Sequence, residues 1–427
     1  MHISIPFGKT VLDLEVPDRR LKGVVISRLH ELKSSLPETE IVRRSIEAPI
    51  GTPRLHELAV GKKRIAVITS DHTRPVPSKT TLPLILDEIR RGAPDAAITI
   101  VVASGCHRSM TEEEMRERFG SDVYKREKFL VHDCADDALF TSIGTLPSGV
   151  NCMINRAIID VDLLVAEGFI EPHFFAGYSG GRKAVMPGCA SRLTVLGNHC
   201  SKFIDSDQAR TGILAGNPIH RDMVHAARLA KLSFIVNVVL DSKKRIVASF
   251  AGDLVEAHEK ACEFHASYGA VEAPPADIVI TSNGGYPLDQ NIYQAVKSMT
   301  AAEACCRPGG VIIVASACSD GHGGEKFIRS FEIAPTPEDL MKAYLARQWD
   351  ETEPDQWQTQ ILCRVLMKNR VIMVTGPGAP REMVERLNMR WAPTLDDAMH
   401  MADEILGNPE ADVTVIPDGV GVTVLKQ

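Results

Sequence analysis

The sequence lacks the features that mark several large classes of protein. It has no run of basic residues of the kind that follows a phosphate backbone, and its formal net charge is −7, so nucleic acid is not expected as a partner. No apolar stretch approaches the length needed to cross a bilayer, so no membrane partner is expected either. The first residues, MHISIPFGKTVLDLEV, lack the basic start and apolar centre of a signal peptide. We therefore expect a cytoplasmic location.

Cysteine spacing and glycine spacing exclude further classes. The ten cysteines form no C-x-x-C pair, which excludes a zinc ribbon and a thioredoxin-like motif. A cytosolic chain of this length needs no disulfides, so we expect reduced and mostly buried thiols. No G-x-G-x-x-G follows a predicted strand, and TGPGAPRE at 375–382 is only a faint echo of that dinucleotide-binding pattern.

What the sequence does contain is apolar runs that alternate with helical patterns. A hairpin is predicted at 1–17, strands at 64–70, 98–104, 163–167, 278–282, 311–316 and 371–375, and helices at 80–91, 111–120 and 290–306. Thr111 stands three residues before Glu114, which is a capping-box signature. Strands that alternate with helices are typical of parallel sheets.

A break in this pattern predicts the domain division. Two prolines in VEAPPA at 271–276 interrupt both periodicities and indicate a linker. We expect two α/β domains with largely parallel sheets and an active-site cleft between them. The expected boundaries are 1–270 and 277–410, with the strands at 411–427 able to return to the first domain.

Reactive side chains follow the predicted strands, where open α/β sheets bind ligands. Strand 64–70 leads into a short polar loop that ends at Arg74, which suits bidentate capture of a carboxylate or phosphate. Strand 98–104 leads into His107, a residue type suited to proton transfer near neutral pH. The alternative interpretation is a helix cap with a surface arginine in the first loop and a structural or exposed histidine in the second.

The segment EPHFFAGYSGGRKAVMPGCA at 171–190 is the part of the chain richest in candidate site residues. Its glycines would let the backbone approach a phosphorylated ligand closely, although a plain surface loop also needs glycine for its turns. It is not a Walker A loop, because Arg182 precedes Lys183 and alanine follows. A desolvated Lys183 could serve as a covalent anchor. His173 and His199 could hold a transition metal with other ligands, but their spacing alone is a weak signal.

The second half offers one polar cluster and one isolated aromatic residue. Gln294 and Lys297 are neighbours on one face of the predicted helix, where they could bind a carboxylate and a carbonyl or hydroxyl group. Such pairs more often form a solvated face. Asp289 is expected to cap this helix. Trp357 lies in a polar segment, where it could wall a pocket or fill an interface.

Five segments together resemble the nickel-dependent lactate racemase family. They are DHTRPVPSK at 71–79, GCHRSMTEEE at 105–114, EPHFFAGYSGGRKAVMPG at 171–188, GNH at 197–199 and YPLDQNIYQAVK at 286–297. The resemblance covers essentially the whole chain, and the block at 171–199 is its most specific part. Cys106 and Ser109 depart from the family, in which Thr and Pro are more usual at these positions.

The resemblance implies a cofactor that few other enzymes use. This nickel-pincer nucleotide, Ni(II)-pyridinium-3,5-bisthiocarboxylate mononucleotide, would be tethered to Lys183 through a thioamide, with His199 as the protein's nickel ligand. The resemblance places four consecutive residues and a proline around the cofactor: Asp71, His72, Thr73, Arg74 and Pro187. It makes His107 and His173 the paired acid–base residues. It assigns substrate contacts to Arg74, Tyr293, Gln294, Lys297 and Trp357.

The family chemistry explains these residue types. Removal of an α-proton beside a carboxylate is difficult, whereas loss of hydride gives a planar 2-oxoacid that can take hydride back on either face. A base must take the hydroxyl proton as the hydride leaves, and two histidines on opposite sides can do this for the two enantiomers. The cofactor is the hydride acceptor, so the difficult step belongs to it.

The resemblance therefore implies an isomerase that racemises or epimerises a small 2-hydroxyacid, with lactate as the default substrate. Malate or another 2-hydroxyacid is the alternative, and a diacid would need one more cation, for which Arg108 and Arg182 are candidates. A dehydrogenase or lyase, or a carrier of the nickel cofactor, stays open as another class. Other proteins would assemble the cofactor in trans. A homo-oligomer is compatible with the sequence, which does not specify the oligomeric state.

Overall fold

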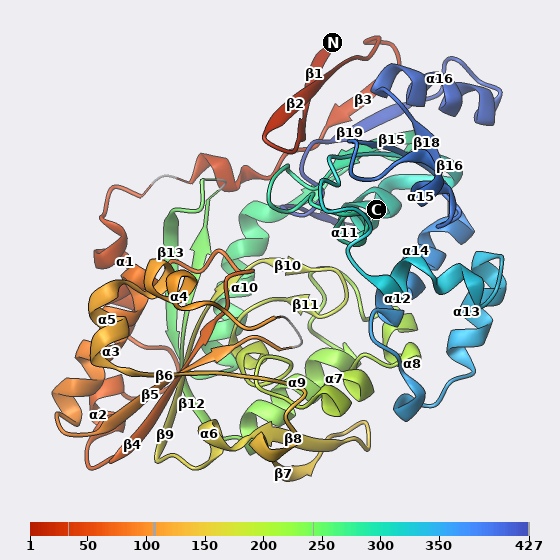
Figure 1. Ribbon diagram of the computed structural model, residues 1–427. Helices are drawn as coiled ribbons and strands as arrows, with labels where there is room; N and C mark the ends of the chain where they lie inside the picture. The colour runs from red at the N-terminus through yellow and green to blue at the C-terminus, as the bar shows by residue number, and fades with distance from the viewer. Residues whose placement is uncertain (33, 106–107, 242, 426–427) are drawn as a thin grey trace. The chain divides into compact units, whose positions relative to one another are not determined.

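The computed structural model describes the chain except at residues 33, 106–107, 242 and 426–427 (Figure 1). Two compact units make up the chain. Unit 1 comprises 1–27, 199–207 and 268–427, and unit 2 comprises 28–198 and 208–267. The chain therefore passes between the units at 27–28, 198–199, 207–208 and 267–268.

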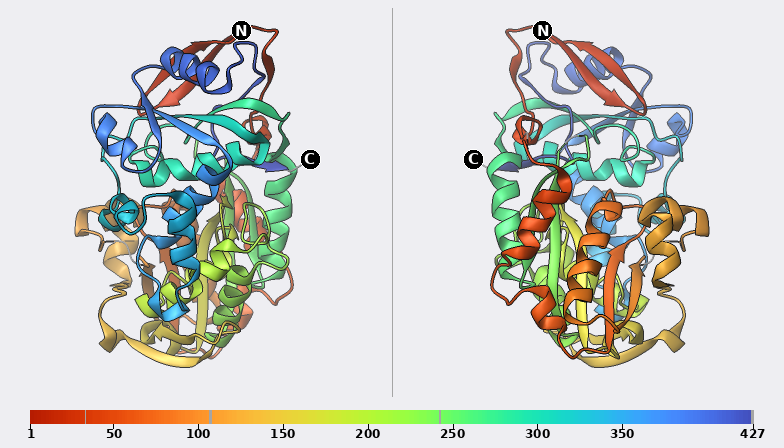
Figure 2. Two further views of the ribbon diagram at one scale, coloured as in Figure 1. Left: turned by 90° about the vertical axis from the view of Figure 1, so that its right-hand side faces the viewer. Right: turned by 90° about the vertical axis from the view of Figure 1, so that its left-hand side faces the viewer.

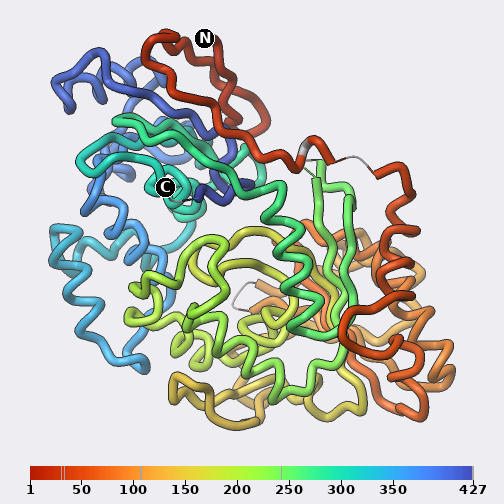
Figure 3. Tube along the Cα trace, turned by 180° about the vertical axis from the view of Figure 1, so that it is seen from behind, coloured from red at the N-terminus to blue at the C-terminus, as the bar shows by residue number. Residues whose placement is uncertain are grey.

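Unit 2 is built on a six-stranded sheet. Its strands, in spatial order, are β13 (Ile246–Gly252), β12 (Leu232–Leu240), β9 (Leu163–Ile170), β4 (Arg64–Ser70), β5 (Ala97–Ala103) and β6 (Lys128–Val131). All neighbouring pairs are parallel except β12 and β13, which form the antiparallel hairpin visible as adjacent green tubes in Figure 3. Every residue of β9 is buried, as expected for a strand covered on both faces.

Helices cover both faces of this sheet (Figure 2). One face packs against α1 (Glu38–Glu47), α2 (Leu55–Ala59) and α3 (Ser78–Gly92), whose apolar residues share a core with alternate residues of β4, β5 and β12. The remaining helices of the unit are α4 (Glu112–Phe119), α5 (Ser121–Arg126), α6 (Arg156–Ile159), α7 (Arg192–Asn198), α9 (Pro218–Leu229) and α10 (Glu256–Gly269). A hairpin of β7 (Phe140–Thr145) and β8 (Asn151–Asn155) completes it.

The strand order of unit 2 reverses between β4 and β9. From β4 the chain builds outward through β5 to β6, and then returns to place β9 on the other side of β4. At such a switch point the loops after the two central strands diverge and leave a crevice in which α/β proteins bind ligands. The loops concerned are 71–77 and 171–183, and both carry predicted site residues.

Unit 1 contains a second six-stranded sheet, and its pairs are all parallel. The order is β18 (Arg390–Ala392), β17 (Arg370–Thr375), β16 (Cys306–Ser316), β15 (Ala276–Ser282), β19 (Val413–Ile416) and β3 (Leu21–Val24). Two small sheets accompany it: β1 (His2–Phe7) with β2 (Thr10–Glu15), and β14 (Ala270–Glu272) with β20 (Thr423–Leu425). The helices are α8 (Ser201–Asp205), α11 (Ile292–Cys305), α12 (Glu325–Ile328), α13 (Pro337–Leu345), α14 (Gln356–Lys368), α15 (Arg381–Glu385) and α16 (Leu395–Leu406).

The sheet of unit 1 also has a switch point, which lies between β15 and β19. The chain runs outward from β15 through β16 and β17 to β18, and then returns to add β19 on the other side of β15. The loop that follows β15 leads directly into α11, which carries Tyr293, Gln294 and Lys297. The topology therefore puts these three residues at the place where this sheet would bind a ligand.

The expected α/β class with largely parallel sheets is confirmed, but the units differ from the expected domain boundaries. Residues 1–27 were expected in the first domain, whereas β3 pairs with β19 in the sheet of unit 1. The strands at 411–427 were allowed to return to the first domain, whereas β19 pairs with β15 and β20 pairs with β14. A division at one linker cannot anticipate a sheet that is completed by both ends of the chain.

Candidate functional site

The loop after β4 forms a tight turn around the Asp71 side chain. Asp71 is buried, and its Oδ1 accepts hydrogen bonds from the Thr73 backbone N–H at 3.0 Å and from the Thr73 hydroxyl at 2.6 Å. An aspartate that bonds to the backbone two residues on fixes the direction of such a turn. The Arg74 side chain is exposed, and the Nδ1 atom of His72 is buried with no hydrogen-bond partner among the described residues. The turn thus offers a cation and an imidazole to a ligand.

A buried carboxyl group binds the chain on both sides of this loop. Glu167 of β9 accepts hydrogen bonds from the hydroxyls of Thr69, Ser78 and Thr81. Burial raises the pKa of this carboxyl, while the three hydroxyls and the nearby Arg118 oppose the rise. The three hydroxyls come from β4 and α3, so Glu167 joins the strands on both sides of the switch point to the helix that follows the loop.

Arg118 of α4 lies in the same region. Its Nε donates to the Ser70 carbonyl at 3.0 Å, and its Nη2 is buried without a hydrogen-bond partner in the described chain. Burial lowers the pKa of Arg118, and the carboxylates of Glu167 and Asp71 act against that decrease. Sequence reasoning missed both Glu167 and Arg118. A single acidic residue within the apolar run LLVAEGFI was the signal for Glu167.

The loop after β9 begins with a short hairpin that holds His173. Its strands are β10 (Pro172–His173) and β11 (Gly177–Tyr178), and the Ala176 N–H donates to His173 Nδ1 at 3.3 Å. The imidazole packs edge-on against Phe175, with ring centroids 4.5 Å apart. A neutral ring that accepts at Nδ1 carries its proton on Nε2, so this nitrogen is set to donate.

Lys183 lies in a single 3-10 turn, η3 (Gly181–Ala184), that follows this hairpin. The backbone at Gly180 has φ 77° and ψ −178°, a region open essentially only to glycine. A Cβ at Gly180 would lie 2.6 Å from the Asn237 side-chain oxygen, which accepts a hydrogen bond from the Gly181 N–H. The half-buried Lys183 is thus carried by a turn that glycine alone permits.

Gly188 links the Lys183 turn to the loop after β5. Its N–H donates to the Lys183 carbonyl at 3.0 Å, and its own carbonyl accepts from the Gly105 N–H at 3.1 Å. Half-buried Pro187 stands next to this junction. The predicted acid–base residue His107 and the family departure Cys106 lie outside the described residues. Arg108, one of the two cations considered for a diacid, forms two hydrogen bonds with the Glu114 carboxylate.

Arg182 is not available to a substrate, so its proposed role as a cation for a diacid is wrong. The side chain is fully buried, and its guanidinium donates to three backbone carbonyls of its own loop. It also contacts the half-buried His220 and the buried His258. The sequence carried no signal for these two partners, which lie on α9 and α10.

Unit 1 brings together His199, Tyr293 and Trp357. The His199 imidazole lies edge-on to the Trp357 indole at 5.1 Å between ring centroids, and the indole N–H donates to the Tyr293 hydroxyl at 3.0 Å. The segment after His199 is anchored here as well, because Ser201 contacts Gln356 and Gln360 of α14. Trp357 therefore packs between His199 and Tyr293 in this cluster.

Gln294 and Lys297 stand half-buried on α11, one turn apart. The expected cap of this helix is wrong: Asn291 accepts from the Gln294 N–H, and Asp289 does not cap it. Buried Asp289 instead accepts from the backbone N–H groups of Gly8 at 2.6 Å and Ala317 at 3.1 Å. It thereby fixes the loop before α11 to the tip of the N-terminal hairpin.

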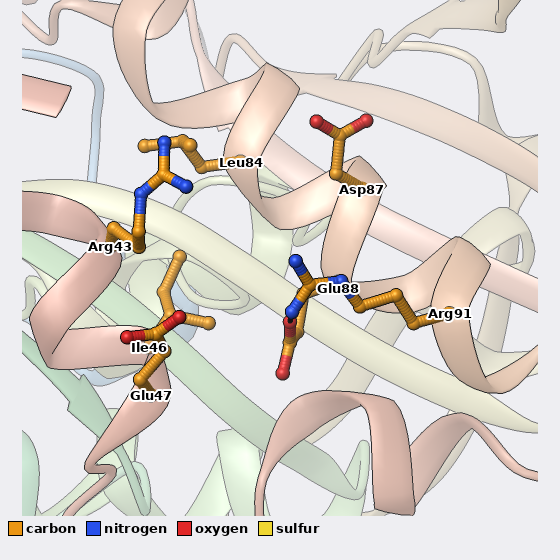
Figure 4. A pocket seen from close by; sticks show the side chains of 7 residues that line it. All are labelled: Arg43, Ile46, Glu47, Leu84, Asp87, Glu88 and Arg91. Atoms are coloured by element: carbon orange, nitrogen blue, oxygen red, sulfur yellow. Dashed lines mark hydrogen bonds and ion pairs between the residues drawn. The ribbon is translucent and has the colours of Figure 1, made fainter. Parts of the chain in front are cut away.

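A surface hollow in unit 2 lies away from these loops. Figure 4 shows its lining, which comes from α1 and from the second half of α3 and includes Arg43, Glu47, Asp87 and Arg91. The predicted site residues at 71–74 lie before the start of α3, at the carboxyl end of β4. The hollow therefore belongs to the opposite end of the helix, and it holds none of the predicted residues.

Metal-binding clusters and membrane-spanning helices were the next features sought in the described part of the chain. Within the described ranges, no group of three or more His, Cys, Asp or Glu side chains could hold a metal ion. Among the described helices, none is long and apolar enough to span a membrane. Nine cysteines, all except Cys106, are described; each is buried, and none forms a disulfide within the described part of the chain.

The comparisons with known proteins agree along the whole chain. The family models for the lactate racemase N-terminal and C-terminal domains match residues 7–212 and 271–424. A lactate racemase from Thermoanaerobacterium thermosaccharolyticum is 53% identical over 426 residues, with 100% of both chains covered. A lactate racemase from Lactiplantibacillus plantarum is 47% identical over 422 residues, with 99% of each covered.

Two solved structures match the fold. The lactate racemase apoprotein of T. thermosaccharolyticum has a TM-score of 0.96 and covers 100% of both chains at 53% identity. A protein from Thermotoga maritima has a TM-score of 0.65 at 20% identity, and the match covers 93% of this chain and 99% of that one. The second likeness concerns the fold alone.

Proposed function

Because this chain belongs to the lactate racemase family and is an isomerase, we propose that it interconverts the two enantiomers of lactate. The observation that carries the proposal is the match to lactate racemases of two organisms over the full length of the chain. The position of most of the predicted residues supports it, because those at 71–74, 173–187 and 293–297 follow the central strands β4, β9 and β15 at the switch points of the two sheets.

The residues present fit a nickel-pincer nucleotide. Lys183 would carry the tether on its glycine turn, whose backbone packs closely against Asn237 and His258. His199 would supply one imidazole ligand to nickel. The absence of a protein metal cluster within the described chain agrees with a metal that is held mainly by an organic group. When bound, this group supplies a reversible acceptor for hydride.

The loop after β4 would hold the cofactor's polar groups and the substrate's carboxylate. Asp71 and Thr73 fix the turn, and the exposed Arg74 guanidinium has the planar fork that pairs with a carboxylate. His72 contributes a buried nitrogen whose hydrogen bond is unmade within the described chain, and Pro187 would line the pocket. A bound anion would be the charge and hydrogen-bond partner of these groups.

Unit 1 would supply the remaining substrate contacts. Gln294 and Lys297 present an amide and an ammonium one helical turn apart, which suits a hydroxyl and a carboxylate. The indole of Trp357 and the phenol of Tyr293 are held by their mutual hydrogen bond and would exclude water from the reacting carbon.

His173 would move the hydroxyl proton. Its neutral ring carries the proton on Nε2, which is the form that can donate to the oxygen of a 2-oxoacid as the alcohol re-forms. His107 would be its counterpart for the other enantiomer. Paired acid–base residues have no use in a cofactor carrier, which favours an enzyme that turns over.

A monocarboxylate suits the site better than a diacid such as malate. The second carboxylate of a diacid would need another cation. Arg182 is buried and Arg108 is engaged by Glu114, so both candidates are occupied within the fold. We therefore propose lactate ahead of malate, with other short 2-hydroxyacids as alternatives.

The proposal includes a cytoplasmic location and supply of the cofactor by separate biosynthesis proteins. Nine buried cysteines without a disulfide among the described residues agree with a reducing compartment. A small-molecule substrate is the only ligand that the reaction itself requires besides the cofactor.

Chiral analysis of product tests the proposal. The chain would be produced together with a cofactor-biosynthesis system and incubated separately with L-lactate and D-lactate. We expect both incubations to reach the same mixture of enantiomers. The Lys183→Ala variant should leave each enantiomer unconverted. A wild-type chain that carries the cofactor but leaves both enantiomers unchanged, while converting another 2-hydroxyacid, would contradict lactate as the substrate.

A further inference from the structure

Arg182 is the largest fully buried side chain in the described chain, and it stands next to Lys183. Its Nη1 donates to the carbonyls of Ser179 at 3.1 Å and Gly180 at 3.2 Å, and its Nη2 donates to that of Ala176 at 2.9 Å. All three acceptors belong to the loop that leads into the Lys183 turn. The loop is therefore wrapped around the guanidinium that follows it in sequence.

Two helices hold the guanidinium from outside the loop. Arg182 Nε donates to His220 Nδ1 of α9 at 3.0 Å, and Arg182 Nη1 lies 2.8 Å from His258 Nε2 of α10. His258 Nε2 also lies 2.9 Å from the Ser179 carbonyl. The five contacts of Arg182 use the rigid fork of arginine, and an ammonium group could not reproduce their directions.

The charge of this cluster is unusual for a protein interior. No carboxylate of the described chain forms an ion pair with Arg182, and burial lowers the pKa of its guanidinium to about 10. Burial and the positive charge of Arg182 together lower the pKa of His220 to about 3. The same two causes lower the pKa of His258 well below its usual value. Both imidazoles are therefore neutral near pH 7, and dipoles alone hold the cation.

Such a buried cation is costly, and replacing it with apolar residues would often stabilise a protein. Its contacts are instead concentrated on the backbone of one loop. Gly180 and Gly181 both have positive φ, and a Cβ at Gly181 would lie 2.9 Å from the His258 ring. The glycines let the loop close tightly over the cluster, and the half-buried Lys183 follows it directly along the chain.

We propose that Arg182 is the positioning residue for Lys183, and that His220 and His258 fix Arg182 for this purpose. The inference rests on the proposed function, in which Lys183 carries the cofactor. Arg182 touches neither cofactor nor substrate. It sets the backbone from which the Lys183 amine is presented, so that attachment depends on a cluster of side chains from three parts of unit 2.

The Arg182→Lys variant tests the proposal, because it keeps the charge and loses the fork. Wild type and variant would each be produced with the cofactor-biosynthesis system, and the folded protein isolated by size exclusion. Intact mass and peptide mapping would then give the modified fraction at Lys183. We expect this fraction of the folded protein to fall about tenfold or more, as misplacement of a reacting group by about 1 Å allows.

Two further variants make the result specific. Arg54→Lys alters another arginine fork of unit 2, the one that pairs with Glu88, far from the Lys183 turn. It should lower the melting temperature without changing the modified fraction. His220→Ala removes only one of the five contacts, so it carries the test if Arg182→Lys does not fold, and we expect an intermediate loss of modification.

The outcomes separate the inference from the function on which it rests. An unmodified wild-type chain, from a system that loads another family member, would overturn the proposed function and this inference with it. A modified wild type with equally modified Arg182→Lys or His220→Ala protein would overturn the inference alone. Reduced modification in Arg54→Lys to the same extent would also overturn it, because ordinary loss of stability would then explain the effect.

Discussion

The surroundings of His173 favour one tautomer of its neutral imidazole. The backbone N–H of Ala176 occupies Nδ1, and the rings of Phe174 and Phe175 fix the plane of the imidazole. Nε2 is then the nitrogen that would exchange a proton with a substrate oxygen. The proposed role of His173 therefore follows from its local packing as well as from its place after β9.

The His173→Ala variant separates proton transfer from cofactor attachment. Racemisation should fall by about 10²–10⁴-fold, which is the usual contribution of a positioned acid or base. Modification of Lys183 and the nickel content should stay at the wild-type level, because His173 is not assigned to either. Chiral chromatography and metal analysis on the same preparation measure both. Loss of nickel with intact chemistry would remove His173 from this role.

Arg74 offers a test of substrate binding. The Arg74→Lys variant keeps the charge and loses the bidentate fork, so KM for lactate should rise about tenfold, equivalent to about 1.4 kcal/mol. The kcat value should change less if the carboxylate is held equally in the ground state and the transition state. An unchanged KM would place the carboxylate elsewhere, with Lys297 as the next candidate.

Single residues also show which structural features could be predicted from the sequence. The reactive residues after β4 and β9 could be predicted, because apolar runs mark strand ends plainly. Arg182 and Asp289 could not be read correctly, since their partners lie far away in sequence, as with Asp289 and the N–H of Gly8. A polar residue in a loop gives the same sequence signal whether its side chain binds a ligand or the protein's own backbone.

Among the elements, the glycine turn before Lys183 is held in a backbone conformation that glycine alone readily adopts. The Gly180→Ala variant would force a side chain into a glycine-only backbone region and against Asn237. Gly149→Ala is the matched control, because Gly149 also has positive φ, and a Cβ added there would meet no described atom within 4 Å. The control measures the conformational cost alone.

We expect Gly149→Ala to lower the free energy of unfolding by about 1–2 kcal/mol and to leave Lys183 modification unchanged. Gly180→Ala should cost about twice as much and also reduce modification at Lys183. Chemical denaturation and intact mass measure the two effects. Equal behaviour of the two variants would show that the close approach of the Gly180 backbone has no part in presenting Lys183.

Strand positions were predictable where a strand is buried on both faces. The run at 64–70 coincides with β4, and the run at 98–104 differs from β5 by one residue at each end. The capping box of Thr111 and Glu114 is confirmed as well. The run at 163–167 was too short, because Gly168 interrupts the apolar pattern although β9 continues to Ile170. Local patterns fix an element better than they fix its ends.

Across the whole molecule, four histidines of unit 2 are buried or half-buried and neutral near pH 7. Burial lowers the pKa of His132 and His265 to about 4 and, with Arg182, that of His220 to about 3. His258 also has a pKa well below its usual value. Each of them takes up a proton on unfolding when the pH lies below about 6.5, the unfolded value. Their contribution to stability is therefore complete above that pH and is lost as the pH falls.

We expect unit 2 to lose stability from about pH 6.5 down to about pH 4. Each histidine contributes a slope of up to about 1.4 kcal/mol per pH unit. The His265→Phe variant keeps a ring beside Tyr178 and removes one of the four groups. Scanning calorimetry between about pH 7.5 and about pH 4.5 should show a smaller decrease in melting temperature for this variant. An unchanged slope would exclude His265 as a contributor.

The division into two units was the part of the fold that the sequence predicted least well. The linker at 271–276 lies close to the last passage between the units, at 267–268, but the other three passages left no mark. Residues 1–27 join unit 1 through the pairing of β3 with β19, which stand near opposite ends of the chain. The short segment 199–207 joins unit 1 through contacts of Ser201 with α14. Pairings of this kind depend on three-dimensional closure that a single sequence does not display.

We propose that the hydrogen on carbon 2 of lactate leaves and returns as hydride, and racemisation in D2O follows that hydrogen. L-lactate would be racemised by the cofactor-loaded protein in D2O, and the D-lactate formed would be analysed by mass spectrometry. We expect D-lactate without deuterium on carbon 2, because hydride does not exchange with solvent protons. Deuterium at that carbon in the product would contradict it, since it would mean that the centre is inverted by removal of a proton.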